Sequence, residues 1–232
     1  MPSKTIAWAV HLFTASGAVL GVFALWEICR GEFARAAIYL LAALAIDSVD
    51  GTLARRVGVA ERLPRIDGRT LDDVVDYLNY GIVPVVFLLQ LGAFTHWSVA
   101  ILPVLAASYG FAQVDVKTED DFFLGWPSYW NIYAFYAGLW MQGRGPLAPG
   151  LVLLALTVLT LTPVRFVYPN LAPRGWRLPM LGGAVVWTAL IVALLPTYPA
   201  CPPALVAASL VYPAFYLIAS FWLDGASRRQ GR

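Results

Sequence analysis

Asp47-Ser-Val-Asp50-Gly51-Thr-Leu-Ala54-Arg55 and then Gly68-Arg-Thr-Leu-Asp72-Asp-Val-Val-Asp76 set four aspartates at the edges of two apolar runs. The first run begins near Ala36, and the second continues to Leu91. Ionisable side chains at membrane depth are costly and are usually kept for a function. The spacing of these aspartates therefore bears on both the fold and the chemistry of the chain.

The composition is that of a membrane protein. The chain has 232 residues, of which 59% are hydrophobic and 13% charged, and its mean hydropathy is +0.68. Soluble domains carry about 25% charged residues. We therefore expect a single membrane domain over residues 1–232, embedded in a lipid bilayer. No basic arm indicates nucleic-acid binding. No small-residue cleavage pattern ends the first apolar run, which predicts a retained span rather than a signal peptide.

Long apolar runs divide the chain into candidate membrane spans. Each is near the roughly 20 residues that a helix needs to cross the hydrocarbon, and continuous runs lack the alternation of barrel strands. Prolines mark turns between the later runs. The sequence predicts an all-α polytopic membrane protein of about eight transmembrane helices, at residues 7–28, 33–54, 73–91, 94–114, 122–142, 147–164, 178–195 and 203–223.

The loop charges predict the orientation. With the N-terminus in the cytoplasm, 13 of the 16 lysines and arginines fall on the cytoplasmic side, in accord with the positive-inside rule. They are Lys4, Arg55, Arg56, Arg62, Arg65, Arg69, Lys117, Arg165, Arg174, Arg177, Arg228, Arg229 and Arg232; Arg30, Arg35 and Arg144 fall outside. Both termini and the aspartates are therefore expected at the cytoplasmic face. Cys29 and Cys201 fall on the outer side, either as two unpaired thiols or as a disulfide in an oxidising compartment.

The aspartates are spaced to share helical faces. Asp47, Asp50, Gly51 and Ala54 recur at i, i+3, i+4 and i+7, and Gly68, Asp72 and Asp76 recur at i, i+4 and i+8. The loop between the two helices is short, which favours antiparallel neighbours. We therefore expect the two helices to point four carboxylates at one another.

Four neighbouring carboxylates require protons or a cation, because they repel strongly at low dielectric. Oxygen ligands without His or Cys favour a hard divalent ion such as Mg²⁺ or Mn²⁺, and Mg²⁺ in such sites commonly completes its shell with substrate phosphates. Arg55 and Arg56 supply charge suited to phosphate. The alternative is a set of salt bridges to the nearby arginines. Asp73 lies off the shared face and is expected to be solvated or salt-bridged.

These residues resemble the signature of the CDP-alcohol phosphatidyltransferase family, D-x2-D-G-x2-A-R followed by G-x3-D-x3-D. The matching positions are Asp47, Asp50, Gly51, Ala54, Arg55, Gly68, Asp72 and Asp76. The twelve-residue spacer at 56–67 is longer than is usual in the family and looks like the bacterial phosphatidylcholine synthase branch. The eight predicted spans and the segments 7–14 and 122–131 look like the same branch.

The resemblance implies a reaction and a set of roles. Choline plus CDP-diacylglycerol would give phosphatidylcholine plus CMP at the cytoplasmic face of the bacterial inner membrane. Two divalent ions, Mn²⁺ or Mg²⁺, would be held by Asp47, Asp50, Asp72 and Asp76, with Asp76 also the general base. The nucleotide lipid would be bound by Asp50, Gly51, Ala54, Arg55, Gly68 and Asp72. A homodimer is also implied. Some members place a hydroxyl residue on the nucleotide a few residues past the arginine; Glu61 stands near that place here, so that role is not carried over.

An aromatic stretch is the candidate choline site, because proteins hold quaternary ammonium groups with aromatic faces. Four aromatic residues recur at i, i+3, i+4 and i+7, which predicts one helical face, and a further tyrosine lies one turn beyond Asp76. The candidates are Trp126, Tyr129, Trp130, Tyr133 and Tyr80. The alternative is an aromatic belt at the membrane interface.

Two other functions fit parts of the sequence. Transfer to another alcohol, such as serine, glycerol phosphate or inositol phosphate, would use the same aspartates with a basic pocket from Arg56 and the loop arginines. A cation transporter would use the aspartates as its ion path, although no matching acids lie deeper or on the far side. His11 and His96 are predicted to be structural or interfacial.

Overall fold

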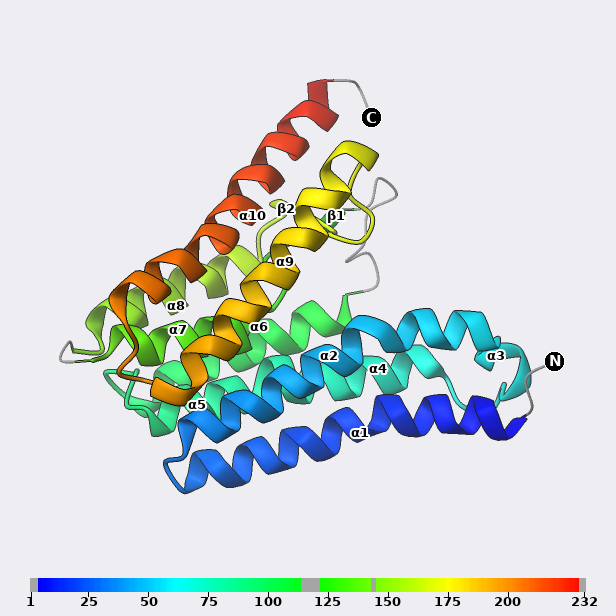
Figure 1. Cartoon of the computed structure of the whole chain (residues 1–232), viewed down its shortest axis with the longest axis horizontal. Coiled ribbons are helices and arrows are strands. Elements are labelled where there is room, and N and C mark those ends of the chain that lie inside the picture. Colours follow the sequence, from blue (N-terminus) through cyan, green and yellow to red (C-terminus); the bar gives the residue numbers. More distant parts are fainter. Residues whose placement is uncertain (1–3, 114–121, 143–144, 230–232) are drawn as a thin grey trace.

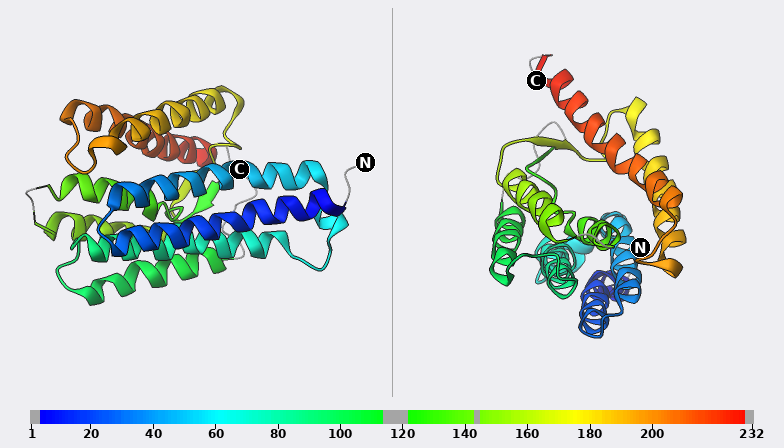
Figure 2. Two further views of the ribbon diagram at one scale, coloured as in Figure 1. Left: turned by 60° about the horizontal axis from the view of Figure 1, so that its bottom comes forward. Right: turned by 90° about the vertical axis from the view of Figure 1, so that its left-hand side faces the viewer.

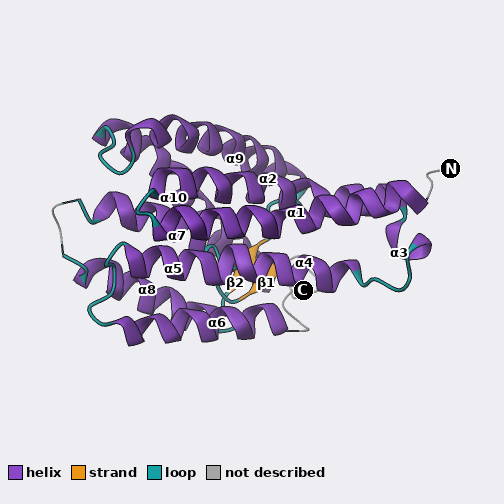
Figure 3. Cartoon of the chain, turned by 90° about the horizontal axis from the view of Figure 1, so that it is seen from below, coloured by secondary structure: helices purple, strands orange, loops and turns teal. Residues whose placement is uncertain are grey.

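The structure is a computed structural model that describes residues 4–113, 122–142 and 145–229, and these residues are almost entirely helical (Figure 3). Three of the charges counted for orientation, Lys117, Arg144 and Arg232, lie outside the described residues, as does the side chain of Arg228.

The first two helices form a long antiparallel pair (Figure 1). Helix α1 spans Lys4–Cys29 and α2 spans Phe33–Val57. Helix α2 ends where Gly58 takes φ of +65°, a left-handed conformation that glycine adopts without a Cβ penalty, and the short helix α3 follows at Val59–Arg62. The pair matches the first two predicted spans and carries Asp47 and Asp50 on the second half of α2.

The third predicted span is one continuous helical segment with a change of pitch. Helix α4 spans Gly68–Asp76, a π-helical turn η1 spans Tyr77–Ile82, and α5 spans Val83–Gln90. The segment begins earlier than the predicted residue 73, because the Asp67 carboxylate caps α4 by accepting from the Arg69 backbone N–H at 3.0 Å. π-Turns are rare and frequently mark functional sites, and this one directly follows the aspartates.

The middle of the chain departs from the predicted helices. The 3₁₀ turn η2 (Trp97–Ala100) and α6 (Ile101–Ala112) match the predicted span 94–114. The predicted helix over 122–142 is wrong in its first third, since α7 covers Trp130–Trp140 alone. Gly125 (φ +81°), Pro127 and Ser128 (φ +51°) interrupt it, because a left-handed conformation or a proline breaks a helix. Helix α8 then spans Leu147–Thr160.

Two segments form a small antiparallel sheet, one at the start of the predicted helix 122–142 and one just after the predicted helix 147–164. Strand β1 (Phe122–Leu124) pairs with β2 (Arg165–Val167), with Phe123 opposite Phe166. The turn at Gly125 is fixed in part by its backbone N–H, which donates to the Val164 carbonyl at 2.7 Å. The sheet was not predicted, and it joins two segments about forty residues apart in the chain.

The last two long helices form a separate layer over the others (Figure 2). Helix α9 spans Arg174–Leu194, the 3₁₀ turn η3 spans Leu195–Thr197, and α10 spans Pro203–Arg229. At one end of this layer β2 packs on α10, and at the other end η3 packs on α2. The layer therefore meets the rest of the molecule near both of its ends.

Four helices among the described residues are long and apolar enough to cross a membrane: Lys4–Cys29, Phe33–Val57, Arg174–Thr197 and Pro203–Ser227. Shorter apolar helices lie at Trp97–Ala112 and Leu147–Thr160. Large apolar side chains face outward on the long helices, including Leu178 at 80% exposure. Such faces suit lipid rather than water.

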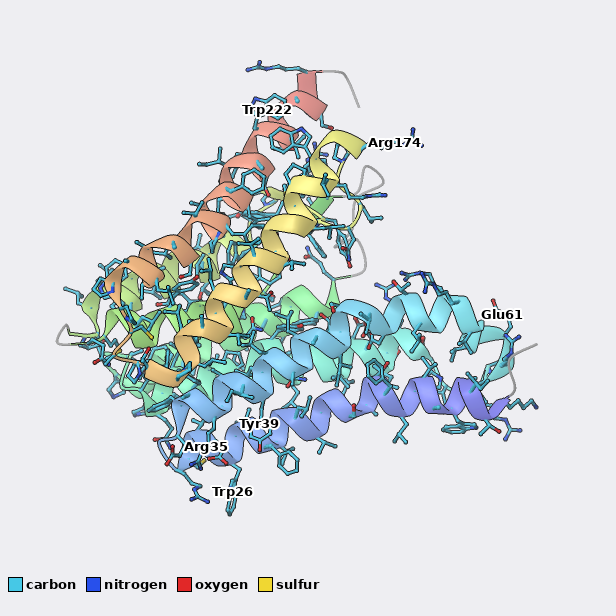
Figure 4. All side chains as sticks on the ribbon, in the orientation of Figure 1. Trp26, Arg35, Tyr39, Glu61, Arg174 and Trp222 are labelled. Carbon is cyan, nitrogen blue, oxygen red and sulfur yellow. The ribbon has the colours of Figure 1, made fainter. Side chains whose placement is uncertain are left out.

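The two ends of the α1–α2 pair carry different side chains. Trp26 and Arg35 lie at the end where the pair turns, and Glu61 lies at the opposite end (Figure 4).

Cys29 and Cys201 are both free thiols, and the Cys201 thiol donates to the Leu194 carbonyl at 3.2 Å. The structure thus has the two cysteines unpaired.

Candidate functional site

Three of the four predicted carboxylates meet at one point between α2 and α4. Oxygen atoms of Asp47, Asp50 and Asp72 all lie within 4.8 Å of one another. Asp50 is buried, and the other two are half-buried. An all-oxygen donor set of this size suits a hard divalent cation. The residues present therefore fit a metal ion.

Asp76 lies beside this cluster, one turn after Asp72. It interacts electrostatically with Asp47, Asp72 and Asp50, in decreasing order, and it lines the same cavity as Asp47 and Asp72. The four signature aspartates are thus gathered at one place, as their helical spacing predicted. Asp73 also lines this cavity, and it forms an ion pair with Arg69 at 3.8 Å, which agrees with its expected role as a salt-bridged residue.

Tyr80 connects the π-turn to the carboxylates. Its hydroxyl donates to Oδ2 of Asp47 at 2.7 Å, and its side chain is buried. Other residues of the turn are held by different neighbours: Tyr77 shares a hydrogen bond with Ser108 at 2.8 Å, and the Asn79 amide donates to the Gly17 carbonyl at 3.0 Å. The turn therefore anchors to α1 and α6 while directing one hydroxyl to a candidate metal ligand.

The small residues of the signature have protein neighbours here. A Cβ added to Gly68 would lie 3.3 Å from Cε1 of His11, and Ala54 packs against the apolar cluster that joins α1 and α3. A Cβ on Gly51 would meet Nη1 of Arg55 at 3.4 Å. The Gly68 contact gives this glycine a packing reason, the close approach of α1, in addition to its predicted role toward a nucleotide.

Charged groups around the mouth of the site are exposed. The Arg55 guanidinium donates to Thr52 Oγ1 at 3.2 Å and remains accessible to an anion. In the loop before α4, hydrogen bonds from the Thr70 hydroxyl and the Arg69 backbone N–H hold the pKa of Asp67 below its usual value. Asp67 is therefore a helix cap rather than a fifth member of the acidic cluster.

A cavity of about 1370 Å³ runs from the carboxylates along the space between α2, α7 and the α9–α10 layer. Asp47, Asp72 and Asp76 line one part of it, and Trp140 and Cys201 line another. Its walls are mostly apolar and aromatic, so it offers apolar surface continuous with a polar site. This arrangement suits a ligand with a charged head and a hydrocarbon body.

The five predicted aromatic residues lie in two environments, the cavity and the apolar core. Tyr80, Trp126, Tyr129 and Tyr133 line the cavity, whereas Trp130 is fully buried in the core. They do not share one helical face, because α7 begins at Trp130 and the preceding residues are not helical. The rings of Trp126 and Tyr129 meet edge to face with centroids 5.9 Å apart. The Tyr133 hydroxyl donates to the Pro149 carbonyl.

One aromatic residue near the carboxylates was missed. Tyr168 follows β2, lines the cavity, and interacts electrostatically with Asp47, Asp72 and Arg55. It lies 92 residues from Asp76 in the chain, in a segment whose only local signal is a Tyr-Pro-Asn turn. No periodicity could have linked it to the site, because the link depends on the pairing of β2 with β1.

Comparison with known proteins agrees with the site. Residues 8–195 match the model of the CDP-alcohol phosphatidyltransferase family. A phosphatidylcholine synthase of Legionella pneumophila is 38% identical over 93% of this chain and 88% of its own length. A phosphatidylcholine synthase of Legionella bozemanae is 34% identical over 88% of this chain and 98% of its own length. One of Rhizobium meliloti is 31% identical over 94% of this chain and 90% of its own length. The chain belongs to the CDP-alcohol phosphatidyltransferase family.

Proposed function

We propose that this protein is a phosphatidylcholine synthase, which transfers the phosphatidyl group of CDP-diacylglycerol to choline and releases CMP. The observation that carries the proposal is the meeting of Asp47, Asp50 and Asp72 within 4.8 Å at a large apolar cavity, in a chain of this family. The names of the relatives support the choice of choline as acceptor.

The carboxylates are the proposed ligands of two divalent ions, Mn²⁺ or Mg²⁺. Asp47, Asp50, Asp72 and Asp76 would hold them, and the bound ions would supply positive charge to the diphosphate and to the departing CMP. The exposed Arg55 guanidinium, together with Gly51, Ala54 and Gly68, is proposed to face the cytidine diphosphate. Arginine suits this place because its planar donors match phosphate oxygens.

Asp76 is the proposed general base. An alcohol is a weak nucleophile at neutral pH, so a carboxylate within hydrogen-bond reach assists it by taking its proton. The choline oxygen then forms a bond to the β-phosphorus attached to diacylglycerol, the bond from that phosphorus to the CMP oxygen breaks, and the proton passes to Asp76. The position of Asp76 at the cavity beside Asp47 and Asp72 supports this assignment.

The acceptor is proposed to be held by aromatic side chains at the same cavity. Tyr80, Trp126, Tyr129 and Tyr133 line it, and Trp130 packs directly behind Tyr133, with ring centroids 6.5 Å apart. Aromatic faces attract a quaternary ammonium through their quadrupole. The apolar part of the cavity is proposed to receive the lipid, and the chain is proposed to work in a bacterial cytoplasmic membrane.

The membrane arrangement is also a proposal. Eight transmembrane segments with both termini in the cytoplasm would put the carboxylates at the cytoplasmic face, where a nucleotide-bearing substrate is available. The charge distribution supports this orientation. A homodimer stays a prediction from the family resemblance.

The direct test is CMP release by the purified protein in detergent–lipid micelles. We expect release from CDP-diacylglycerol that requires both choline and Mn²⁺ or Mg²⁺, and a loss of roughly 10²- to 10⁴-fold in Asp76→Asn. Release with serine, glycerol phosphate or inositol phosphate, but not with choline, would assign that alcohol as the acceptor in place of choline. Release that needs no acceptor, or none under any condition, would overturn the proposal.

A further inference from the structure

Tyr168 is placed at the cavity by a set of contacts outside the family signature. It directly follows β2, and the tip formed by Tyr168, Pro169 and Asn170 lines the cavity that also holds Asp47, Asp72 and Asp76. The carboxylates come from the N-terminal half of the chain, and this tip comes from the C-terminal half. The two halves thus face one another across the site.

Strand β2, which directly precedes Tyr168, is hydrogen-bonded to α10. Arg165 Nε donates to Oδ1 of Asp224 at 2.5 Å, and both side chains are about 15% exposed or less. The Val167 backbone N–H donates to Ser220 Oγ at 3.3 Å, and the Val167 carbonyl accepts from the Tyr216 hydroxyl at 3.2 Å. A buried charge pair costs desolvation that close hydrogen bonding must offset, and this pair fixes the position of β2 against α10.

The Arg165 side chain is held on a second face as well. Its guanidinium carbon lies 4.8 Å from the centre of the Phe122 ring, and its Nη2 reaches Ser227 Oγ at 3.4 Å. Because Phe122 is on β1 and Asp224 on α10, Arg165 links the sheet to the outer helical layer. Breaking the link would let the strand, and with it Tyr168, move relative to the carboxylates.

The ring and the hydroxyl of Tyr168 have different surroundings. The ring packs on Phe123 with centroids 4.7 Å apart and planes 32° from parallel, so one face is occupied. Burial raises the pKa of the Tyr168 hydroxyl, the nearby charges of Asp47 and Asp72 raise it further, and Arg55 lowers it. A tyrosine hydroxyl, whose ordinary pKa is about 10, is protonated at neutral pH and can donate a hydrogen bond.

We propose that Tyr168 is a substrate-contacting residue, whose hydroxyl donates to a phosphate oxygen of the nucleotide lipid, and that Arg165 and Asp224 are positioning residues that hold it there. The inference rests on the proposed function, since it needs a diphosphate between the carboxylates and Arg55. The ring is already packed on Phe123, which favours the hydroxyl over the ring as the functional group.

The test compares Tyr168→Phe, Asp224→Asn and the double variant. Phenylalanine keeps the packing on Phe123, so we expect an unchanged unfolding temperature. A lost hydrogen bond to a charged group should lower kcat/KM for CDP-diacylglycerol roughly 10- to 100-fold, with the KM for choline unchanged. CDP-diacylglycerol without choline should also protect Y168F against heat less than it protects the wild type.

The double variant separates positioning from general stability. If Asp224 acts through Tyr168, D224N should lower kcat/KM in the wild type and have little further effect in Y168F, because residues that act through one contact are not additive. Tyr109→Phe is the matched control: Tyr109 is 68% exposed and should retain wild-type kinetics.

Two results would overturn the inference alone: wild-type kinetics and heat protection in Y168F, or equal losses from D224N in both backgrounds. Absence of choline-dependent CMP release by the wild-type protein would instead overturn the proposed function, and the inference with it.

Discussion

Asp72 and Asp73 are neighbours on α4 whose carboxylates face different partners. Asp72 lies within 4.8 Å of Asp47 and Asp50, whereas Asp73 pairs with Arg69 at 3.8 Å and is 44% exposed. Removing an outer-shell partner of a metal ligand costs roughly 10- to 100-fold in metal affinity, and removing a ligand should cost at least as much. We therefore expect Asp72→Asn to weaken Mn²⁺ binding by that factor or more.

Asp73→Asn is the control for this prediction, because it removes a similar charge from the same turn. An exposed ion pair contributes about 0–1 kcal/mol, so D73N should bind Mn²⁺ almost as the wild type does. Mn²⁺ electron paramagnetic resonance, which counts free ion, measures both variants. Equal weakening in D72N and D73N would mean that the site responds to net charge rather than to coordination.

Tyr80 offers a second residue-scale prediction, because its hydroxyl bonds a candidate ligand. Tyr80→Phe removes the 2.7 Å hydrogen bond to Asp47 and leaves the ring. Outer-shell partners of this kind are worth roughly 10- to 100-fold in metal affinity or activity. We expect Y80F to need more Mn²⁺ for half-maximal activity and to recover activity at saturating Mn²⁺.

Tyr77→Phe is its matched control, since Tyr77 lies on the same π-turn but bonds Ser108. It should leave the Mn²⁺ dependence unchanged. If Y80F instead kept its Mn²⁺ dependence and raised the KM for choline, the hydroxyl of Tyr80 would act on the acceptor rather than on Asp47.

At this scale the sequence was informative where side-chain spacing follows a helix. The i, i+3, i+4 spacing on α2 and the i, i+4, i+8 spacing on α4 were enough to predict that the aspartates gather, since both segments are regular helices. The aromatic set failed as one face because Gly125, Pro127 and Ser128 end the periodicity before Trp130. The position of Tyr168 at the cavity could not be predicted from local spacing, because it depends on the pairing of β2 with β1.

Glycines at the crossing of α9 and α10 make an element-scale prediction. A Cβ on Gly183 would lie 2.6 Å from Cδ2 of Tyr212, and the Tyr212 ring is held by its hydroxyl, which donates to the Met180 carbonyl at 3.0 Å. The ring therefore cannot move away cheaply. Overpacking of this kind costs about 1–3 kcal/mol, so Gly183→Ala should lower the unfolding temperature.

Gly182 is the neighbouring control, because no atom of the residues that the structure describes lies within 4 Å of a Cβ added there. Gly182→Ala should be neutral or stabilise α9 by up to about 1 kcal/mol, the helix preference of alanine over glycine. Thermal unfolding in micelles measures both. If G183A unfolds no earlier than G182A, the packing of α10 on α9 at this point is looser than the contacts indicate.

The element boundaries followed local chemistry more than hydropathy. The third span was predicted to start at residue 73, yet the helix begins at Gly68 because Asp67 caps it. The helix predicted over 147–164 ends at Thr160, where the chain turns to form β2. Apolar runs located the segments, but caps and left-handed residues set their ends.

The arrangement of whole layers was the least predictable feature. Hydropathy located the apolar segments, but nothing local determines that α9 and α10 form their own layer (Figure 2) or that a cavity of about 1370 Å³ lies beneath it. That geometry depends on distant contacts, such as Arg165 with Asp224 and η3 with α2. The charge pattern, in contrast, makes a prediction for the whole molecule that can be tested.

The orientation of the molecule can be tested with single cysteines. Cys29 is exposed at the turn end of α1, and Glu61 and Arg174 are exposed at sites expected on the other face. In a Cys201→Ala background, a membrane-impermeant maleimide should modify Cys29 in intact spheroplasts. In the cysteine-free chain, Glu61→Cys and Arg174→Cys should react only after the membrane is opened.

The physical reason is the excess of lysine and arginine expected on one side, 13 of 16 residues, which the positive-inside rule assigns to the cytoplasm. Labelling of both E61C and R174C in intact spheroplasts, with Cys29 of the Cys201→Ala chain protected, would mean that the molecule is inverted and that the carboxylates lie away from cytoplasmic nucleotide. Labelling of E61C and R174C from opposite sides would contradict the predicted even number of spans between these two residues. The pattern of three labels thus decides both the orientation and the parity of the spans that bring the carboxylates and Tyr168 to the same face.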